Sequence, residues 1–409
     1  MTHDGKTLLI LGGSHCQRSA FAMARARGYK TALFDYLPNP PAAVLADLHV
    51  QASTFDVEEC LKEAQKLPLS GVMTLGTDQP VYTAACIAAK LGLPGLLAVD
   101  TAYAVTHKAR MKEIFTRAGI PAAPYCLVKG CDFSAVPFAG PVVLKPTDSQ
   151  GQRGVLRAET LEAAARLAPQ TLAHSREEAL LCEAYYPSDE ITVSAWVTAG
   201  QAHILTVTDR RTFPHPRHIG VCAAHCFPSR AARGREGEVE RLTQAVAQAF
   251  GVPTGPLYIQ MLIGREGIKV NEVACRIGGA FEDVFIPKVT GFDILGAVMD
   301  AAVGLLVSPP ESRKPRGCVR ELMLFAREGC IAALAPLKAL RDLPFVLDAG
   351  YAMGVGDRVP PLKNAGARLG YAVIWAPDEQ AMARQLETFY QTLYIQDAQG
   401  NDLLLRRER

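Results

Sequence analysis

The fold is decided by two stretches, VVLKPTDSQGQRGV at residues 142–155 and VNEVACRIGGAFEDVF at residues 270–285. The first is an apolar strand that ends in Lys145 and runs into a short polar loop containing glycines. The second carries Glu272 and Arg276 four residues apart, just before a pair of glycines. Backbone amides in a glycine loop can surround phosphates, and carboxylates are ligands for magnesium. In this order, the two stretches predict ATP-driven activation of a substrate.

Length and composition describe an ordinary globular protein of more than one domain. A chain of 409 residues exceeds the usual size of a single hydrophobic core, so we expect roughly two or three domains. Hydrophobic residues make up 49% and charged residues 21%, which excludes a disordered chain. The formal charge of +2 gives no reason to expect nucleic acid or an anionic membrane as a partner.

Cysteine usage and the N-terminus favour the cytoplasm. The eleven cysteines are odd in number and never spaced C-x-x-C, which argues against a zinc ribbon or a thioredoxin-like site. Cys222 and Cys226 flank His225, but no second half of a metal site follows, so small residues on a buried strand are the simpler interpretation. The start, MTHDGK, has no apolar signal segment, and no stretch has the length needed to span a bilayer. We therefore expect a protein of the reduced cytoplasm.

The first ninety residues alternate apolar strands with helical patterns, which predicts a parallel α/β unit. Strands are expected at 7–11, 31–34 and 71–75, and helices at 18–27 and 81–91. A glycine turn follows the first strand and Asp35 ends the second, as in dinucleotide-binding proteins. The turn GGSHCQRS lacks the third glycine, and His15 and Gln17 stand where pyrophosphate would approach. NAD binding is therefore not expected, and the glycines allow a tight turn whose amides face a substrate.

The rest of the chain divides into a long middle region and a shorter C-terminal one. We expect domains at 1–105, 106–308 and 309–409, of which the second is two-lobed and the last is a small α+β lobe. Helices are expected from Lys108 and at 161–167, 236–250 and 379–393. Strands 190–196 and 203–208 pair across Gly200, a loop follows at 210–217, and strands 257–262 and 268–274 form a hairpin through the turn GREG. Two further strands are expected at 319–325 and 371–375.

Four charged residues are candidates to hold a nucleotide. Lys108 and Lys145 each lie beside a tract suited to phosphates, where a cation offsets the charge that develops as the terminal phosphoryl group leaves. A ribose hydroxyl needs a carboxylate acceptor, which suits Glu190, and the apolar backbone around Glu183 offers a slot for adenine. Taken singly, each lysine also fits a solvated strand end, and each glutamate fits an exposed loop edge.

Glu272 is the residue hardest to explain without a ligand. Alternation along its strand puts Glu272 on the face of Ile268 and Val270, so we expect its side chain to point inward. A buried carboxylate needs a partner, and magnesium on nucleotide phosphates would supply one. Gln260, on the other strand of the hairpin, reaches the same region, and the guanidinium of Arg276 suits a phosphoryl group or a substrate carboxylate. A plain Glu272–Arg276 ion pair is the competing explanation.

In this order, these residues resemble the ATP-grasp superfamily, and in particular its carboxylate–amine ligase branch, which includes the L-amino acid ligases. The resemblance covers nearly the whole chain, from the turn GTDQP at 76–80 to GDRVPP at 356–361 and RLGYAVIWAPDEQAM at 368–382. It implies an α/β and α+β fold: a Rossmann-like pre-ATP-grasp domain, a two-lobed ATP-grasp domain and a small α+β C-terminal lobe. It also implies ATP and magnesium, or manganese, as cofactors.

The resemblance assigns roles to individual residues. It implies that the phosphates contact Lys108, Lys145, Ser149 and Gly151, adenine contacts Glu183, Ala184 and Tyr185, and ribose contacts Glu190. It further implies that Gln260 and Glu272 hold the metal, and that Arg276 and Lys145 are catalytic. Gln260 departs from the family pattern, because the first metal ligand is usually glutamate, and Ala274 replaces the asparagine of the usual E-x-N-x-R. A neutral amide oxygen offsets less phosphate charge, so weaker metal binding is expected.

The implied reaction joins a small-molecule carboxylate and a small-molecule amine, with no nucleic acid or membrane involved. The carboxylate attacks the γ-phosphate of ATP, and the amine captures the acyl phosphate to give an amide, ADP and phosphate. A homodimer is common among proteins with this resemblance.

Substrate contacts are harder to place. The candidates are Arg217 and His218, in a basic loop that also fits a solvated surface, and the pair Gly278 and Gly279. Two other functions stay open. One is a carboxylase of the same fold that activates bicarbonate, although the chain has no A-M-K-M biotinylation segment. The other is a nucleotide-binding regulatory protein that has lost catalysis, which Gln260 favours.

Overall fold

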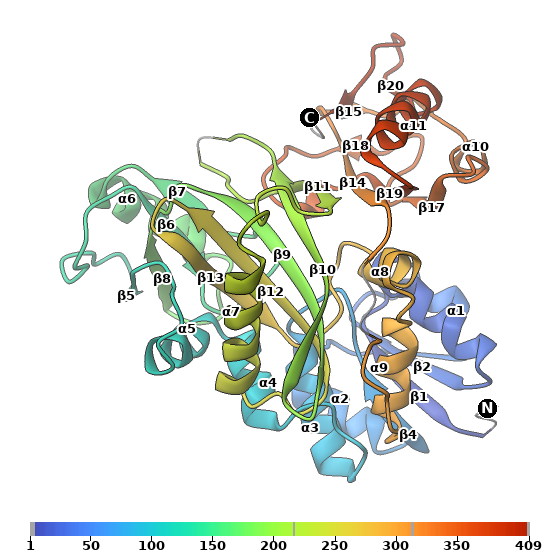
Figure 1. Cartoon of the computed structure of the whole chain (residues 1–409), viewed down its shortest axis with the longest axis horizontal. Helices are drawn as coiled ribbons and strands as arrows, with labels where there is room; N and C mark the ends of the chain where they lie inside the picture. The colour runs from blue at the N-terminus through green and yellow to red at the C-terminus, as the bar shows by residue number, and fades with distance from the viewer. Residues whose placement is uncertain (1–4, 216, 312–314, 407–409) are drawn as a thin grey trace.

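The computed structural model of the chain describes residues 5–215, 217–311 and 315–406. In these residues the strands form one nine-stranded sheet, two four-stranded sheets and two two-stranded pairs. Figure 1 shows the N-terminal sheet in blue, the long central strands in green and yellow, and the C-terminal segment in red at the far end. The mixed α/β and α+β architecture expected from the sequence is confirmed.

The N-terminal sheet is parallel and has the order β3-β2-β1-β4. Its strands are β1 (Thr7–Leu11), β2 (Lys30–Asp35), β3 (Leu48–Gln51) and β4 (Leu69–Met73), with helices α1 (Arg18–Ala26), α2 (Val57–Ala64) and α3 (Pro80–Leu91). Three of these strands and the helices α1 and α3 were expected, whereas α2 was not. Helix α3 ends at Gly92 in the left-handed conformation, as its sequence predicts. The edge strand β3 was missed because its residues, LHVQ, are half-buried or exposed and carry no apolar run.

A small antiparallel sheet in the middle region carries Lys145 and Glu183. It has the order β5-β8-β6-β7 and lies beside helix α6. Its elements are β5 (Tyr125–Lys129), β6 (Val142–Pro146), β7 (Leu156–Ala158), α6 (Leu161–Leu172) and β8 (Ala179–Ala184), preceded by α4 (Val99–Thr106) and α5 (Lys108–Arg117). Lys145 lies on β6 and Glu183 on the neighbouring β8, two strands that pair directly.

The large sheet begins with the two hairpins expected from the sequence. Its strands are β9 (Ser188–Thr198), β10 (Gln201–Thr212), β11 (Cys222–Phe227), β12 (Gly255–Gly264) and β13 (Gly267–Ala274), followed by β14 (Cys318–Ala326), β19 (Gly370–Ala376) and β17 (Val346–Tyr351). Helix α7 (Glu236–Ala249) packs on the apolar face of β9, β12 and β13 (Figure 1). Arg210 was expected in a loop, but β10 continues to Thr212, because the paired strands β9 and β11 extend its ladder.

Elements of the C-terminal third of the chain pack against the N-terminal sheet or extend the large sheet. Helices α8 (Glu282–Thr290) and α9 (Ile294–Ala302) pack into one core with residues of the N-terminal sheet, including Leu8 and Ile10. Strand β14 pairs with β11, so the large sheet continues into the C-terminal segment. The other elements are α10 (Leu337–Arg341), α11 (Glu379–Thr392), β15 (Gly329–Cys330), β16 (Ala333–Leu334), β18 (Arg358–Val359), β20 (Ile395–Gln396), β21 (Leu404–Leu405) and the 3-10 turns His15–Gln17, Ala43–Leu45 and Ala365–Ala367.

The structure shows the state of the cysteines and whether a described helix could span a membrane. All eleven cysteines are free, and Cys222 and Cys226 lie on β11, in agreement with the strand interpretation. Among the described residues, no helix combines the length and the apolar character that crossing a bilayer requires.

A matched pair of leucines tests the shared core. Leu295 on α9 is 1% exposed, whereas Leu306 is fully exposed. We expect Leu295→Ala to lower the free energy of unfolding by about 2–5 kcal/mol, because it removes buried methyl groups and leaves a cavity. The control Leu306→Ala should change it by less than about 0.5 kcal/mol. Equal effects in denaturant unfolding would contradict a common core for α9 and the N-terminal sheet.

Candidate active site

A β-bulge at Asn271 determines which side chains of β13 face the interior cleft. Gln260 pairs with Glu272, but the next residue of β12 pairs with Val270, which leaves Asn271 without a partner in the ladder. The prediction that Glu272 shares the face of Ile268 and Val270 is therefore wrong. Ile268 and Val270 belong to the apolar core under α7, whereas Asn271 and Glu272 both line the cleft, because the extra residue shifts the alternation by one.

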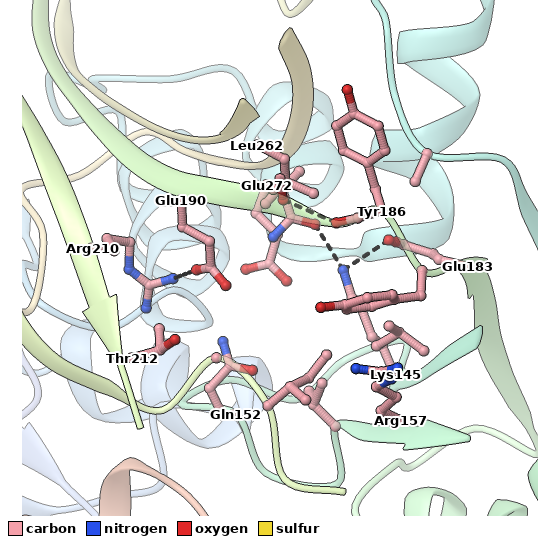
Figure 2. A pocket seen from close by; sticks show the side chains of 18 of the residues that line it. Lys145, Gln152, Arg157, Glu183, Tyr186, Glu190, Arg210, Thr212, Leu262 and Glu272 are labelled. Carbon is pink, nitrogen blue, oxygen red and sulfur yellow. Dashed lines mark hydrogen bonds and ion pairs between the residues drawn. The ribbon is translucent and has the colours of Figure 1, made fainter. Parts of the chain in front are cut away.

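The cleft is a cavity of about 590 Å³ between the small sheet and the large sheet. Figure 2 shows Lys145 and Glu183 on one wall, Glu190 and Arg210 on the opposite wall, and Glu272 between them. The lining includes six residues expected from the sequence: Lys145, Glu183, Ala184, Tyr185, Glu190 and Glu272. A much smaller second cavity contains four more: Lys108, Ser149, Gln260 and Arg276. Glu272 lines both cavities and so marks their junction.

One buried carboxylate, that of Glu183, holds two lysines at the back of the cleft. Its oxygens lie 3.0 Å from Lys112 Nζ and 2.9 Å from Lys145 Nζ. Lys145 also donates to Asn271 Oδ1 at 2.8 Å. An ammonium group has three donors, so one N–H of Lys145 is left for a ligand in the cavity.

The charges of this cluster follow from its geometry. Burial alone would raise the pKa of Glu183, but Lys112 and Lys145 lower it from 4.5 to about 2. Burial and the neighbouring Lys145 lower the pKa of Lys112, although Glu183 opposes this. The pKa of Lys145 is raised, because burial is outweighed by the attraction of Glu183 and Glu272. Of the two lysines, Lys145 is the one that lines the cleft, so its charge faces a ligand there.

Lys108 and the polar loop after β6 lie at the second cavity. Lys108 Nζ donates to the carbonyl oxygen of Ser149 at 2.5 Å and lies 3.8 Å from Glu272 Oε1. Gly151 has a φ of +67°, which the turn of the loop requires and which glycine tolerates best. Gln150 accepts a hydrogen bond from the backbone N–H of Asp78 at 2.6 Å. The loop is therefore held down against the N-terminal domain.

Arg276 pairs with Asp78 rather than with Glu272. Its Nε donates to Asp78 Oδ1 at 2.9 Å, and its Nη2 contacts the same oxygen. The guanidinium also lies 4.5 Å from the ring centre of Tyr258. In the described residues Glu272 is paired with Lys108, so the simple Glu272–Arg276 ion pair does not explain these two residues.

Arg210 occupies the space between the expected ribose and metal residues. Its Nη1 donates to Glu190 Oε2 at 2.6 Å and to Gln260 Oε1 at 3.4 Å. The side chain of Arg210 is 7% exposed, whereas that of Glu190 is 25% exposed and reaches into the cleft (Figure 2). The amide at position 260 thus contacts a cation that a glutamate there would bind more strongly.

The other candidate substrate residues lie outside both cavities. His215, not Arg217 or His218, lines the cleft, and its Nδ1 accepts hydrogen bonds from the backbone N–H groups of both. Gly278 and Gly279 form a tight turn beyond Arg276. A Cβ on Gly279 would lie 2.7 Å from the carbonyl oxygen of Gly76, so this turn needs glycine to touch the N-terminal domain.

Four residues of the site were missed, each for a different reason. Lys112 lies four residues after Lys108 on α5, and this same-face spacing was an available signal. Asp78 stands in the GTDQP turn, whose ion partner is remote in sequence. Arg210 was assigned to a loop, and Asn271 is revealed only by the bulge, which no local pattern shows.

Sequence comparison agrees with this geometry. Residues 138–283 match the ATP-grasp domain model, and residues 322–397 match the L-amino acid ligase C-terminal domain 2. The chain contains an ATP-grasp domain. The expected class, an ATP-dependent carbon–nitrogen ligase, is confirmed at the level of these domains. No curated protein matches the sequence.

Solved structures share the fold of this chain over nearly its whole length. An L-amino acid ligase from Bacillus licheniformis is 18% identical, with a TM-score of 0.83 over 97% of this chain and 100% of that chain. A phosphoribosylglycinamide synthetase from Anaerococcus prevotii is 17% identical, with a TM-score of 0.76 over 96% and 99%. The biotin carboxylase domain of a Hydrogenobacter thermophilus 2-oxoglutarate carboxylase is 17% identical, with a TM-score of 0.76 over 95% and 90%. Identities this low establish the fold alone.

Acid stability tests the Glu183 cluster. A carboxyl whose folded pKa is depressed contributes stability above its unfolded pKa, and this stability is lost as the pH falls through the folded value. We therefore expect Glu183 to contribute stability that disappears between about pH 4.5 and pH 2. At pH 7, Glu183→Gln should unfold more easily than the wild type, because it leaves two buried ammonium groups without a counter-charge. On acidification it should not show the loss of stability that is expected for Glu183 in the wild type. The control Glu58→Gln, at an exposed position of α2, should behave like the wild type in thermal unfolding from pH 2 to 7.

Proposed function

We propose that this protein is a carboxylate–amine ligase that forms an amide through an acyl phosphate and releases ADP and phosphate. The observation that carries this proposal is the position of Glu272 at the junction of two cavities. One cavity has the size and lining for a nucleotide, and the other ends at the guanidinium of Arg276. A γ-phosphate at this junction would face Lys108 and Lys145 on one side and a substrate carboxylate on the other.

The main cavity supports a nucleoside at its outer end. Val143 and Leu262 provide apolar walls for adenine, and the carboxylate of Glu190 suits a ribose hydroxyl. The backbone N–H groups of Ala184 and Tyr185 already donate to the carbonyl oxygens of Pro124 and Pro141, at 2.8 and 2.9 Å. These two amides therefore already have acceptors within the protein. Ala184 and Tyr185 contribute to adenine binding through the shape of the slot.

The donor set fits a magnesium ion carried by nucleotide phosphates. Magnesium is usually held by one or two protein carboxylates together with phosphate oxygens and water. Glu272 is 25% exposed toward the junction, and the amide oxygen of Gln260 lies opposite it in the ladder. When bound, the ion would neutralise charge on the phosphates. Among the described residues, no group of three or more acidic, histidine or cysteine side chains could hold a metal ion. The ion would therefore need the phosphate oxygens as ligands.

The protein side chains then position charge rather than react covalently. The remaining N–H of Lys145 and the ammonium of Lys108 offset the negative charge that grows on the terminal phosphoryl oxygens. Arg276, held by Asp78, presents its guanidinium to the acyl phosphate and keeps its charge. Burial lowers the pKa of Arg276, but the carboxylates and Tyr258 near it, Asp78 foremost, raise this pKa by more. Glu190, with Arg210, fixes the ribose, so that the reacting atoms stay in line.

The C-terminal domain favours a ligase over the other candidate functions. Residues 322–397 match a domain of L-amino acid ligases, which a bicarbonate-activating carboxylase would not require. Measurement of ADP release with MgATP and a panel of amino acids tests the proposal. Release that needs two amino acids supports it. Release that needs bicarbonate indicates a carboxylase, and nucleotide binding without turnover indicates a regulatory protein.

Glu272 provides the sharpest single test of the proposed site. We expect Glu272→Gln to reduce turnover by roughly 100-fold or more, because it removes the carboxylate at the phosphate junction, while thermal unfolding stays close to wild type. Glu266→Gln is the matched control, since Glu266 lies on the same hairpin and its side chain is 72% exposed. Unchanged turnover in Glu272→Gln would remove this residue from the site.

A further inference from the structure

The polar loop of residues 148–154 touches the C-terminal domain, a contact that the proposed reaction does not use. The backbone N–H of Ala365 donates to the carbonyl oxygen of Gly151 at 3.1 Å. The next residue of the loop, Gln152, has a φ of +63°, in the left-handed region that is unfavourable for a residue with a side chain. Its side chain lies against Gly220, since a Cβ there would be 3.1 Å from Gln152 Oε1. Contacts from outside the loop therefore hold its middle in a conformation that is costly for the loop itself.

The turn of residues 364–368, which makes one of these contacts, is anchored in the C-terminal domain. The side-chain oxygen of Asn364 accepts a hydrogen bond from the backbone N–H of Gly366 at 2.8 Å and so caps the turn. Ala367 is 5% exposed and belongs to a small apolar cluster that includes two side chains of β14. The position of Ala365 is therefore set by the C-terminal domain and not by the loop that it contacts.

The same turn also contacts the glycine turn that follows Arg276. Arg368 Nη1 donates to the carbonyl oxygen of Gly279 at 3.3 Å. Arg276 donates to the carboxylate of Asp78, and the backbone N–H of Asp78 donates to Gln150 of the polar loop. The polar loop, the GTDQP turn, the glycine turn and the C-terminal turn thus contact one another in a closed ring. The first three contribute Gln150, Asp78 and Arg276 to the second cavity, whereas no described residue of the C-terminal turn lines either cavity.

We propose that Ala365 is a positioning residue for the nucleotide site. Its N–H holds the polar loop in the conformation in which the loop amides cover phosphate oxygens. A loop that is ordered before the ligand binds does not lose that conformational freedom on binding, so the affinity for the nucleotide is higher. The C-terminal domain thereby supports nucleotide binding without touching the nucleotide. This role rests on the proposed function in one respect, the presence of nucleotide phosphates at the loop.

The substitution Ala365→Pro removes this single donor at a position where the backbone suits proline. Ala365 is the first residue of the 3-10 turn, and Asn364 before it is extended, with φ −160° and ψ −179°. We expect the Kd for MgADP, measured by calorimetry, to rise about 2- to 10-fold, which corresponds to the loss of one hydrogen bond. Amide hydrogen exchange in residues 148–154 of the free protein should become faster, because the loop loses its contact with the turn.

The substitution Ala398→Pro is the matched control. Ala398 is an exposed alanine of the C-terminal domain and follows Asp397, whose carbonyl oxygen accepts from the backbone N–H of Gly400 at 3.0 Å. Ala398 is thus the second residue of a turn, where proline is favoured, and its N–H has no partner among the described residues. We expect its MgADP affinity and its loop exchange to equal those of the wild type. Thermal unfolding of both variants without nucleotide shows whether either proline disturbs the fold.

A second pair of variants tests the same turn if Ala365→Pro does not fold. Asn364→Ala removes the acceptor for the N–H of Gly366 and loosens the turn, so the Kd for MgADP should rise about 2-fold or more. Asn364→Ser keeps an acceptor oxygen next to that N–H and should bind MgADP with an affinity close to that of the wild type. Equal affinities of these two variants would count against the role of the turn.

The outcomes separate this role from the ligase proposal. Equal MgADP affinities of Ala365→Pro and Ala398→Pro would overturn the role of Ala365. Weaker binding without faster exchange in residues 148–154 would also overturn it, because the effect would then not pass through the loop. If the wild type does not bind MgADP, both this role and the nucleotide site fail. If the variants behave as expected but no pair of amino acids releases ADP, the positioning role holds and the ligase proposal fails.

Discussion

The carboxylate of Glu183 is the group on which the catalytic side of the structure depends. It lies between Lys112 of α5 and Lys145 of β6, and Lys145 in turn donates to Asn271 of β13. A single buried charge therefore connects a helix and strands of both sheets. Burial of ionised groups is costly unless each has a partner, so this arrangement fixes the orientation of Lys145. Its one remaining donor faces the cleft as a consequence.

The large sheet separates packing from chemistry by its two faces. One face carries the apolar side chains under α7, and the other carries Glu190, Arg210, Gln260 and Glu272. The bulge at Asn271 makes this division possible on β13, because it adds a second polar side chain to the cleft without exposing the apolar residues. Since the sheet continues into β14, the C-terminal domain contributes Glu321 to the same polar face.

Asp78 connects the parts of the site that lie far apart in the chain. Its carboxylate holds Arg276, and its backbone N–H holds Gln150 of the polar loop. The loop and the guanidinium are thereby fixed by a single turn of the N-terminal domain. This explains why the N-terminal domain, whose described residues line the second cavity but not the main one, is part of the site.

The sequence by itself determined many of the strands, the two hairpins and the order of the lysines and glutamates, because these follow from local periodicity, turn residues and spacing. It also pointed to Glu272, Lys145 and Glu190, which do line one cleft. Only the tertiary structure decided that Glu272 leaves the face of Val270, since a bulge depends on pairing with a second strand. Likewise, the pairing of Glu183 with Lys112 and that of Arg276 with Asp78 join residues distant in sequence. Such partners are chosen by burial, which forces charges to meet wherever packing brings them together, and no local pattern records that choice.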